Sequence, residues 1–466
     1  MMFKQTVVSW SVASALLVMS GGAAASGFAL LEQNASGMGN AYAGGAAVAE
    51  DSSTIFFNPA GLSRLSGKQI LVAAHAIRPS AKFANTGSTA ATLQPASNGN
   101  GGDAGSWALV PNAYFAMEVN PQTRVGLGIN APFGLQTNYQ ANWMGSFQAI
   151  KSKLETINLN PSVSYQVNDA FSFGAGLNYQ HVTGELSSAV NYSAAGAAAG
   201  AATGAAAAIA GGAPVGSAPY LAAVAAGRTA GLAAAGGANS YGVSTMTGSD
   251  SAWGYNFGAL FNLSPQTRLG VAYRSSIKYN LSGSVAFSNV PAALAARLPV
   301  QAVTLAVKMP DSFSVSAFHQ VSDKWEIMGD ATWTGWSVLQ QLKVLSANGT
   351  PLSTTPENWK DTWRVSAGAN YHYSNQWMAR VGLAYDQTPV SDAFRTARIP
   401  DANRFQIALG GQYKPSKESA LDFGYSHLFV NNASISQNLT ASGAGNLVGT
   451  YNNSVDILSV QYAHNF

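Results

Sequence analysis

Residues 26–65 read SGFALLEQNASGMGNAYAGGAAVAEDSSTIFFNPAGLSRL, and this stretch decides how the rest of the chain is interpreted. It is rich in Gly, Ala and Ser, and it keeps neither a helical nor a strand period. Such a segment cannot bury much of its own surface, so it needs an enclosure. From Lys68 onward the chain supplies alternating strands that can close into a barrel. We therefore interpret residues 26–67 as a hatch inside a barrel formed by residues 68–466.

Bulky apolar residues alternate with small or polar ones along many stretches after the hatch. The alternation is clear from Phe171 to Gln180, from Trp363 to His372 and from Leu421 to Ser426. Period two places the two sets on opposite faces of a strand. In a membrane barrel the bulky set faces lipid and the small, polar set faces the lumen. A β-sandwich gives the same alternation, so the lengths of the connections between strands must distinguish a barrel from a sandwich.

The connections alternate between tight turns and long loops. Asn120-Pro121-Gln122 is one of the tight turns, and the longest loop covers about residues 188–250. Short turns at one end and long loops at the other are typical of outer-membrane barrels. The predicted fold class is all-β, a 14-stranded antiparallel transmembrane β-barrel with an N-terminal hatch in the lumen. The expected strands begin near Lys68, Trp107, Thr123, Lys153, Ala170, Ser251, Gln266, Ala302, Lys324, Trp359, Gln376, Arg404, Glu418 and Asn453.

The first residues and the composition both predict export to a Gram-negative outer membrane. Residues 1–25 read as a secretory signal: Lys4 precedes an apolar run, and Ala23 and Ala25 form an A-x-A cleavage pattern. Charged residues make up only 10% of the chain, whereas soluble domains usually carry about 25%. The net charge of +3 gives no reason to expect a nucleic-acid partner.

The expected partners follow from this location. They are outer-membrane lipid and lipopolysaccharide, a hydrophobic small-molecule ligand, and the barrel-assembly machinery, which would read the C-terminal strand ending in Phe466. We expect a monomer.

Catalysis is not expected. The six His are scattered over different predicted strands without metal-ligand spacing, Cys is absent and no G-x-S-x-G elbow is present. We therefore predict no catalytic residue, no metal and no cofactor. Transport of apolar molecules through a pocket shielded from water is the better interpretation.

Several motifs resemble the FadL-type family of outer-membrane transporters. They are Ser36-Gly37-Met38-Gly39, Asn58-Pro59-Ala60, Pro310-Asp311-Ser312-Phe313, Thr334-Gly335-Trp336-Ser337, Gln340-Gln341-Leu342-Lys343 and Arg398-Ile399-Pro400-Asp401. The resemblance implies passive uptake of long-chain fatty acids through an external groove, a luminal pocket, hatch rearrangement and a lateral exit at the third strand. The alternatives are uptake of monoaromatic or alkane hydrocarbons, a surface structural or adhesive barrel, and an outer-membrane enzyme.

The resemblance also implies particular site residues. Phe28 resembles the hatch residue that occupies the pocket in the absence of ligand, and Asn58, Pro59 and Ala60 would act in the hatch gate. Lys343 would bind a carboxylate. By strand alternation alone, Arg364 and Arg380 face the lumen as further ligand-binding candidates.

Two more sites are predicted, each with an alternative. Pro111 and Pro161 lack ladder donors on either side of the third strand, which suggests a lateral opening there or bulges of no consequence. The Ala/Gly-rich loop forms either a disordered segment or two helices with an external groove. That groove would be lined by Ile209, Tyr220, Leu221, Val224 and Leu232.

Overall fold

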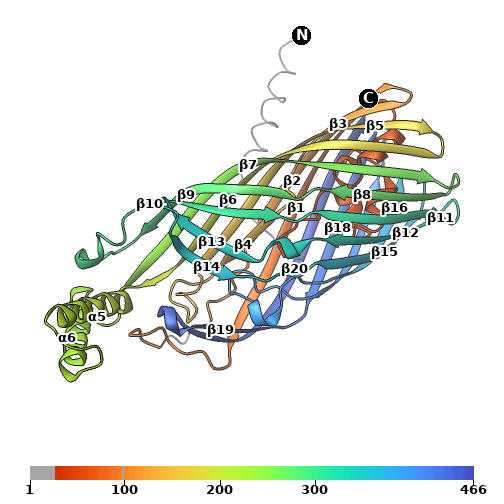
Figure 1. The fold of residues 1–466 in the computed structure, drawn as a ribbon. Helices are drawn as coiled ribbons and strands as arrows, with labels where there is room; N and C mark the ends of the chain where they lie inside the picture. Colours follow the sequence, from red (N-terminus) through yellow and green to blue (C-terminus); the bar gives the residue numbers. More distant parts are fainter. Residues whose placement is uncertain (1–26, 97–98) are drawn as a thin grey trace, which may run out of the picture.

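The computed structural model describes residues 27–96 and 99–466, so the predicted signal peptide lies outside the described residues. All the strands belong to one antiparallel sheet (Figure 1). The sheet closes because β1 (Lys68–Asn85) pairs with both β2 (Ala108–Asn120) and β20 (Gly445–Asn465). The wall contains fourteen strands, which confirms the predicted fold class.

Eight wall strands are continuous, and six are each broken into two segments. The continuous strands are β1, β2, β5 (Lys151–Asn168), β6 (Phe171–Asn191), β7 (Tyr241–Asn262), β16 (Trp377–Asp386), β17 (Arg404–Tyr413) and β20. The broken strands are β3 (Thr123–Asn130) with β4 (Gly134–Asn138), β8 (Thr267–Arg274) with β9 (Ile277–Phe287), β10 (Gln301–Met309) with β11 (Ser312–Gln320), β12 (Trp325–Thr334) with β13 (Gln341–Ser346), β14 (Pro351–Pro356) with β15 (Thr362–His372), and β18 (Ser419–Val430) with β19 (Ala433–Leu439).

The two faces of the wall follow the alternation in the sequence. In β16, Arg380 and Ala384 are buried toward the lumen, whereas Trp377 and Leu383 are exposed on the outside. Exposed Trp, Phe, Leu and Val side chains cover the outer face of many wall strands, where a soluble protein would carry charges. The outer face is therefore suited to lipid.

Residues 27–65 lie inside the barrel, at the end that holds the tight turns and the C-terminus (Figure 1, red). Their short helices are stabilised mainly by contacts with the wall, because helices of four residues are not stable alone. Asn34 caps the first of them by accepting a hydrogen bond from the Gly37 amide. The helices are α2 (Ala35–Met38), α3 (Gly45–Val48), α4 (Thr54–Phe57) and the 3-10 helix η1 (Pro59–Arg64). We call residues 27–65 the hatch.

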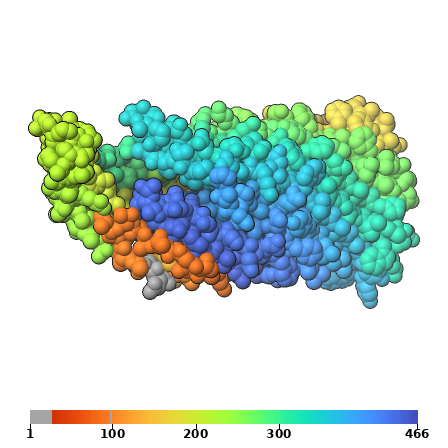
Figure 2. Space-filling model, turned by 60° about the horizontal axis from the view of Figure 1, so that its bottom comes forward, coloured from red at the N-terminus to blue at the C-terminus, as the bar shows by residue number. Residues whose placement is uncertain are grey.

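The Ala/Gly-rich loop forms a helical hairpin, α5 (Tyr192–Ala210) and α6 (Ala218–Ala234), that projects beyond the far end of the wall (Figures 1 and 2). The helices touch along glycines spaced by four: a Cβ at Gly200 would lie 2.1 Å from the Gly227 carbonyl oxygen, and one at Gly231 would lie 2.2 Å from that of Gly196. Short 3-10 turns occur elsewhere, at η2 (Ala292–Leu294), η3 (Trp336–Val338), η4 (Asp392–Phe394) and η5 (Thr440–Ser442).

Candidate functional site

The Asn58-Pro59-Ala60 segment joins the hatch to the wall. Asn58 caps η1 by accepting a hydrogen bond from the Ala60 amide (3.0 Å), and Pro59 occupies the first turn, where no amide donor is needed. The Asn58 amide donates to the carbonyl oxygens of Ala46 (2.7 Å) and of Ala259 in β7 (3.0 Å). One buried side chain thus connects two hatch segments with the barrel. The residues predicted for the hatch gate lie at this contact.

Glycines in the wall leave room for the hatch backbone. A Cβ at Gly258 would lie 1.8 Å from Asn58 Oδ1, and one at Gly174 would lie 2.5 Å from the Ala60 nitrogen. Both distances are too short for any side chain, so these positions require glycine while the hatch is seated. The same holds for Gly270, Gly382, Gly410 and Gly424, which approach other hatch atoms.

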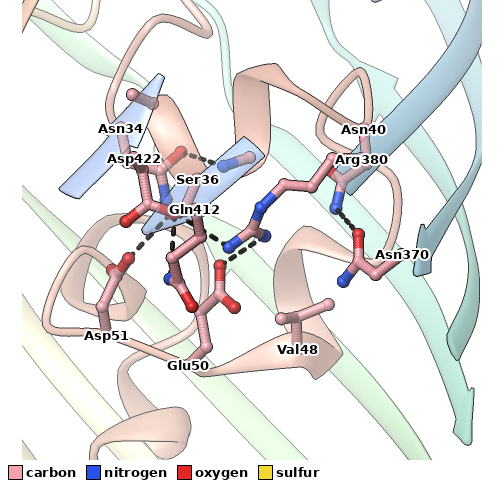
Figure 3. Close-up of polar contacts among 12 residues, drawn as sticks. Asn34, Ser36, Asn40, Val48, Glu50, Asp51, Asn370, Arg380, Gln412 and Asp422 are labelled. Atoms are coloured by element: carbon pink, nitrogen blue, oxygen red, sulfur yellow. Dashed lines mark hydrogen bonds and ion pairs between the residues drawn. The ribbon is translucent and has the colours of Figure 1, made fainter. Parts of the chain in front are cut away.

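Arg380 connects the hatch to a second part of the wall (Figure 3). Its Nη1 donates to Glu50 Oε1 in the hatch (2.7 Å), and its Nη2 donates to Asp422 Oδ1 in β18 (2.9 Å). The Arg380 and Asp422 side chains are almost fully buried. We call Arg380, Glu50 and Asp422 the ion cluster. Because a buried charge without its partner is costly, this cluster favours the seated hatch.

Asp51 extends the polar contact beside the ion cluster. It accepts hydrogen bonds from the Ser36 hydroxyl (2.7 Å), within the hatch, and from the Gln461 amide of β20 (2.9 Å). Gln461 also donates to Asp422 (3.3 Å), and its side-chain oxygen accepts from the Ala35 amide (2.9 Å). Hatch and wall therefore share one hydrogen-bond network at this end of the lumen.

At the other end of the hatch, Phe28 lies in the middle of an aromatic cluster. Its ring centroid is 4.8 Å from that of Trp336, 5.6 Å from that of Trp359 and 6.0 Å from that of Phe133. All four side chains are buried. Each ring comes from a different part of the chain: the hatch, the break between β3 and β4, the break between β12 and β13, and the connection into β15. The four-ring cluster fills the lumen at this level.

The hatch also completes the wall beside the third strand. Along this strand, β3 pairs with β2 only as far as Ala113↔Ile129, and within the described residues no ladder joins residues 108–112 to β4. The chain breaks at Ala131-Pro132-Phe133, where the hatch pairs with it instead. The Leu30 amide donates to the Pro132 carbonyl (2.8 Å), and the Gly134 amide donates to that of Phe28 (2.9 Å).

Side-chain hydrogen bonds join the hatch to both edges of the same gap in the wall. The Asn112 amide of β2 donates to the Glu32 carbonyl (2.7 Å), and the Gln33 amide donates to the Ala131 carbonyl (3.1 Å). On the other flank, the Thr156 hydroxyl of β5 contacts both backbone groups of Phe133, so the strand stays attached there. The interruption is therefore on the β2 side of the third strand.

This geometry bears differently on the two prolines predicted to mark a lateral opening. Pro111 lies on the β2 edge of the gap: it pairs with Ala74 of β1 on one side and, among the described residues, has no ladder partner in the third strand on the other. Pro161 is paired with Leu127, below the break and on the attached side of the strand. The break instead contains Pro132, whose missing donor coincides with the interruption of the ladder.

A cavity of about 610 Å³ lies toward the long loops. Leu342 lines it and also packs against the larger buried core that contains the four rings. Arg398, from the connection between β16 and β17, is the charged residue in its lining. Its Nη1 donates to Ser152 Oγ (3.1 Å) and to the Lys151 carbonyl (3.2 Å), and burial lowers its pKa to about 10. Other lining residues are Leu186, Met246, Val344, Phe147 and Ala198.

The residues predicted to line an external groove do not line this cavity. They lie on the hairpin, where Ile209 and Leu221 are exposed, and the cavity touches only the first turns of α5. The helical interpretation of the loop is thus correct, but the apolar hollow lies at the base of the hairpin. The helix α5 is long and apolar enough to cross a membrane by length and composition, yet it extends from the end of the barrel.

The three basic residues predicted to bind ligand are not brought together. Lys343 is exposed on the outer face of β13, because its neighbours Leu342 and Val344 face inward, and this corrects its predicted place in the pocket. Arg380 faces the lumen but belongs to the ion cluster. Arg364 also faces inward, where it donates to the Ala41 carbonyl (2.8 Å) and to Gln406 (2.9 Å) beside a cavity of about 120 Å³.

The sequence interpretation missed Trp336, Trp359, Phe133 and Arg398 as site residues. Trp336 and Arg398 lie in motifs that carry the family resemblance, so those motifs were the available signal. Phe133 follows Pro132 at the end of a predicted strand, and a proline that interrupts a strand was the available signal for it. For Trp359 the sequence offers no local signal. Among the described residues, no group of His, Asp and Glu side chains is arranged to hold a metal ion.

Glu357, in the connection before β15, holds Trp359 in place. Its Oε2 accepts a hydrogen bond from Trp359 Nε1 (3.1 Å), while its Oε1 has no hydrogen-bond partner among the described residues. Burial raises the pKa of Glu357 to about 7, although the Trp359 bond and the positive charge of Arg398 oppose the shift. The folded protein therefore retains a proton there over a pH range in which an unfolded chain would have lost it.

We expect the stability of the barrel to fall as the pH rises from about 4.5 to 7, because ionising Glu357 is easier in the unfolded chain. The shift corresponds to an upper limit of about 3 kcal/mol at neutral pH. Glu357→Gln should flatten this part of the profile. The measurement is thermal unfolding in detergent from pH 4 to 8, with the exposed Glu418→Gln as control. A wild-type profile that matches that of Glu357→Gln would contradict this expectation.

The fold and the site together define an outer-membrane transport barrel: an antiparallel cylinder with a lipid-facing exterior, a hatch and a partly apolar cavity. The model of the family described as outer membrane protein transport protein (OMPP1/FadL/TodX) matches residues 16–466, so the chain belongs to this family and lies in the Gram-negative outer membrane.

Relatives and solved structures agree with this assignment. The long-chain fatty acid transport protein of Escherichia coli K12 is 29% identical over 440 residues, which cover 92% of this chain and 93% of that protein. A crystal structure of a Pseudomonas aeruginosa FadL homologue matches with a TM-score of 0.80 at 25% identity, covering 94% of this chain and 100% of that one. The Pseudomonas putida toluene transporter TodX shares the fold, with a TM-score of 0.63 at 18% identity over 95% and 100% of the two chains.

Proposed function

We propose that this protein carries long-chain fatty acids passively across the outer membrane. The observation that carries the proposal is the position of the hatch N-terminus, which fills the lumen with Phe28 and closes the gap in the wall with its backbone. A single displacement of residues 27–33 would open both. The relatives named as fatty acid transporters support the substrate class.

The large cavity suits an amphiphile that has a carboxylate. The apolar part of its lining, which includes Leu186 and Met246, can accept an acyl chain, and Arg398 can pair with a carboxylate through a charge-assisted hydrogen bond. Arg398 replaces Lys343 in this role because it lines the cavity, whereas Lys343 lies on the outside of the wall. A chain entering beyond Arg398 would meet Leu342 and then the four-ring cluster.

The exit is lateral rather than straight through the barrel. The ion cluster and the Asn58 contacts hold the rest of the hatch, and the backbone atoms that span the gap belong to residues 28–32. Moving these few residues breaks few hydrogen bonds, whereas ejecting the hatch would leave buried charges without partners. The gap between β2 and the third strand then opens toward the lipid.

A disulfide across the gap tests this route. Ala29 and Phe133 form a non-hydrogen-bonded antiparallel pair, whose usual Cα separation of about 4.5 Å suits a disulfide. The chain has no Cys, so Ala29→Cys with Phe133→Cys introduces the only pair. Uptake of labelled oleate should stop under oxidising conditions and return after reduction, which makes the same protein its own control. Equal uptake in both states would contradict the proposal.

Phe28→Ala should make the barrel leak apolar molecules. The change removes the ring at the centre of the four-ring cluster, at a cost of about 3–5 kcal/mol to the closed state. Entry of a hydrophobic fluorescent dye into cells should therefore rise in the absence of fatty acid. Phe429→Ala, which removes an exposed ring from the outer face, serves as the control and should change nothing. If cells with Phe28→Ala take up no more dye than cells with the wild-type protein, this ring does not close the lumen.

Neutral aromatic hydrocarbons are the alternative substrate, because four aromatic rings meet in the lumen and could stack on a monoaromatic ligand. The two substrate classes differ in their need for a positive charge. Arg398→Gln should weaken oleate uptake and leave toluene uptake unchanged if fatty acids are the substrate. Toluene uptake that survives Arg398→Gln, in a wild-type barrel that takes up toluene but not oleate, would favour the alternative.

A further inference from the structure

Three lysines lie together on the outer face of adjacent wall strands. Lys278 in β9 and Lys308 in β10 are directly opposite each other in the ladder. The ladder between β10 and β13 ends at Leu305↔Val344, so the next position puts Lys343 opposite Ala306, two residues from Lys308 on the same face. All three side chains are exposed. We call them the lysine patch.

The lysine patch lies at a boundary along the barrel axis. Toward the tight turns the outward residues are apolar, as Phe313 and Val315 of β11 illustrate. Toward the long loops the outward residues of β9 are Asn280, Ser282 and Ser284. The patch therefore lies where the hydrocarbon ends and the head groups of the outer leaflet begin.

The patch lacks acidic partners. Among the described residues, none of the three lysines has a salt bridge or a side-chain hydrogen bond, whereas Lys151 pairs with Glu185 at 2.7 Å and Lys153 with Glu155 at 2.8 Å. Three acidic groups of the surrounding strands and connections are hydrogen-bonded elsewhere: Asp250 accepts the amides of Asn280 and Ser251, Asp311 accepts the Tyr273 hydroxyl, and Asp361 accepts the Ser337 amide.

An opposed pair of like charges destabilises a sheet unless an anion lies between them. The anion must sit beside apolar surface, so a phosphate attached to acyl chains fits better than a free one. Lysine binds phosphate as a flexible point charge, and three lysines can reach phosphates on one head group. The acyl chains would then lie against Phe313 and Val315.

We propose that the lysine patch binds the phosphates of a lipopolysaccharide molecule in the outer leaflet. The site is separate from the lumen, and it does not depend on which solute is transported. It gives Lys343 a role on the outside of the wall. The bound lipid would hold β9, β10 and β13 together where the ladder between β10 and β13 ends.

Native mass spectrometry of the barrel in detergent tests the proposal, with diphosphoryl lipid A as the probe. The variant Lys278→Gln/Lys308→Gln/Lys343→Gln should bind it about 100-fold more weakly, since each basic residue near a membrane surface contributes roughly a factor of five. Lipid A without its phosphates should bind the wild-type barrel as weakly as diphosphoryl lipid A binds the triple variant. The matched control is Lys82→Gln/Lys324→Gln/Lys417→Gln, which removes three exposed lysines elsewhere and should bind normally.

Three results would overturn the proposal. The patch variant could bind lipid A as tightly as the wild type, or the control variant could lose as much. Inorganic phosphate could displace lipid A at equal concentration, in which case the patch binds a soluble anion. Heat-dependent gel mobility checks that each variant is folded, and because the lysines are exposed we expect no change in it.

Discussion

Arg380→Met is expected to unseat the hatch and turn the closed barrel into a leaky one. The substitution leaves the buried Asp422 and the partly exposed Glu50 without their shared guanidinium, and breaking a buried pair typically costs about 3–5 kcal/mol. The response that costs least free energy is for Glu50 to move into solvent, which draws the hatch away from β16 and β18. Single-barrel conductance in planar bilayers should rise, and the unfolding temperature in detergent should fall.

Removing all three charges of the ion cluster should partly restore the low conductance and the unfolding temperature of the wild-type barrel. In Arg380→Met/Glu50→Gln/Asp422→Asn neither acidic member of the ion cluster keeps a charge without its partner, so the hatch should stay seated more often than in Arg380→Met alone. Arg228→Ala on the exposed face of α6 controls for the loss of one positive charge. Conductance of Arg380→Met equal to that of the wild type would mean that the other hatch contacts suffice.

The barrel could be predicted because its signals are local. Period two in a strand and the lengths of successive connections are properties of neighbouring residues, and both survive errors in strand boundaries. The same signals placed Arg364 and Arg380 toward the lumen. They could not show that Arg380 meets Glu50, because the sequence does not state which wall strand faces which part of the hatch.

Lys343 shows what happens when a motif is preferred to the local pattern. Its neighbours Leu342 and Val344 are apolar, and they mark the inward face once the strand is known to cross the wall. The motif instead suggested a pocket lysine. The break between β12 and β13 hid the pattern, since η3 interrupts the strand and hides which positions face inward.

The four-ring cluster could not be predicted from sequence, because closure of the barrel assembles it. Phe28, Phe133, Trp336 and Trp359 lie in segments that do not pair with one another as continuous strands. Breaks in the third, ninth and tenth wall strands turn their residues inward at one level, and only there do the rings meet. Of the two prolines that drew attention to this strand, Pro111 lies on the edge of the gap and Pro161 lies on the attached side.

Gly174→Ala should displace the Asn58-Pro59-Ala60 segment from the wall. The added Cβ would lie 2.5 Å from the Ala60 nitrogen and from the Pro59 carbonyl carbon, which are backbone atoms that cannot rotate away. Overpacking of this kind costs about 1–3 kcal/mol, and it also removes the hydrogen bonds that depend on the seated segment. The thermal unfolding temperature should therefore fall, and the bilayer conductance should rise.

Gly184→Ala is the matched control, because it lies on the same strand and faces the same lumen ten residues further on. There a Cβ would meet only Leu281 Cδ2 at 3.7 Å and the Lys153 carbonyl oxygen at 3.9 Å, which are ordinary contacts. Alanine is better than glycine inside a strand by roughly 0.5–1 kcal/mol, so this barrel should be as stable as the wild type or more so. If both variants behave alike, the hatch does not press on β6. If only Gly174→Ala leaks, the segment holds its place by direct contact with a wall built to receive it.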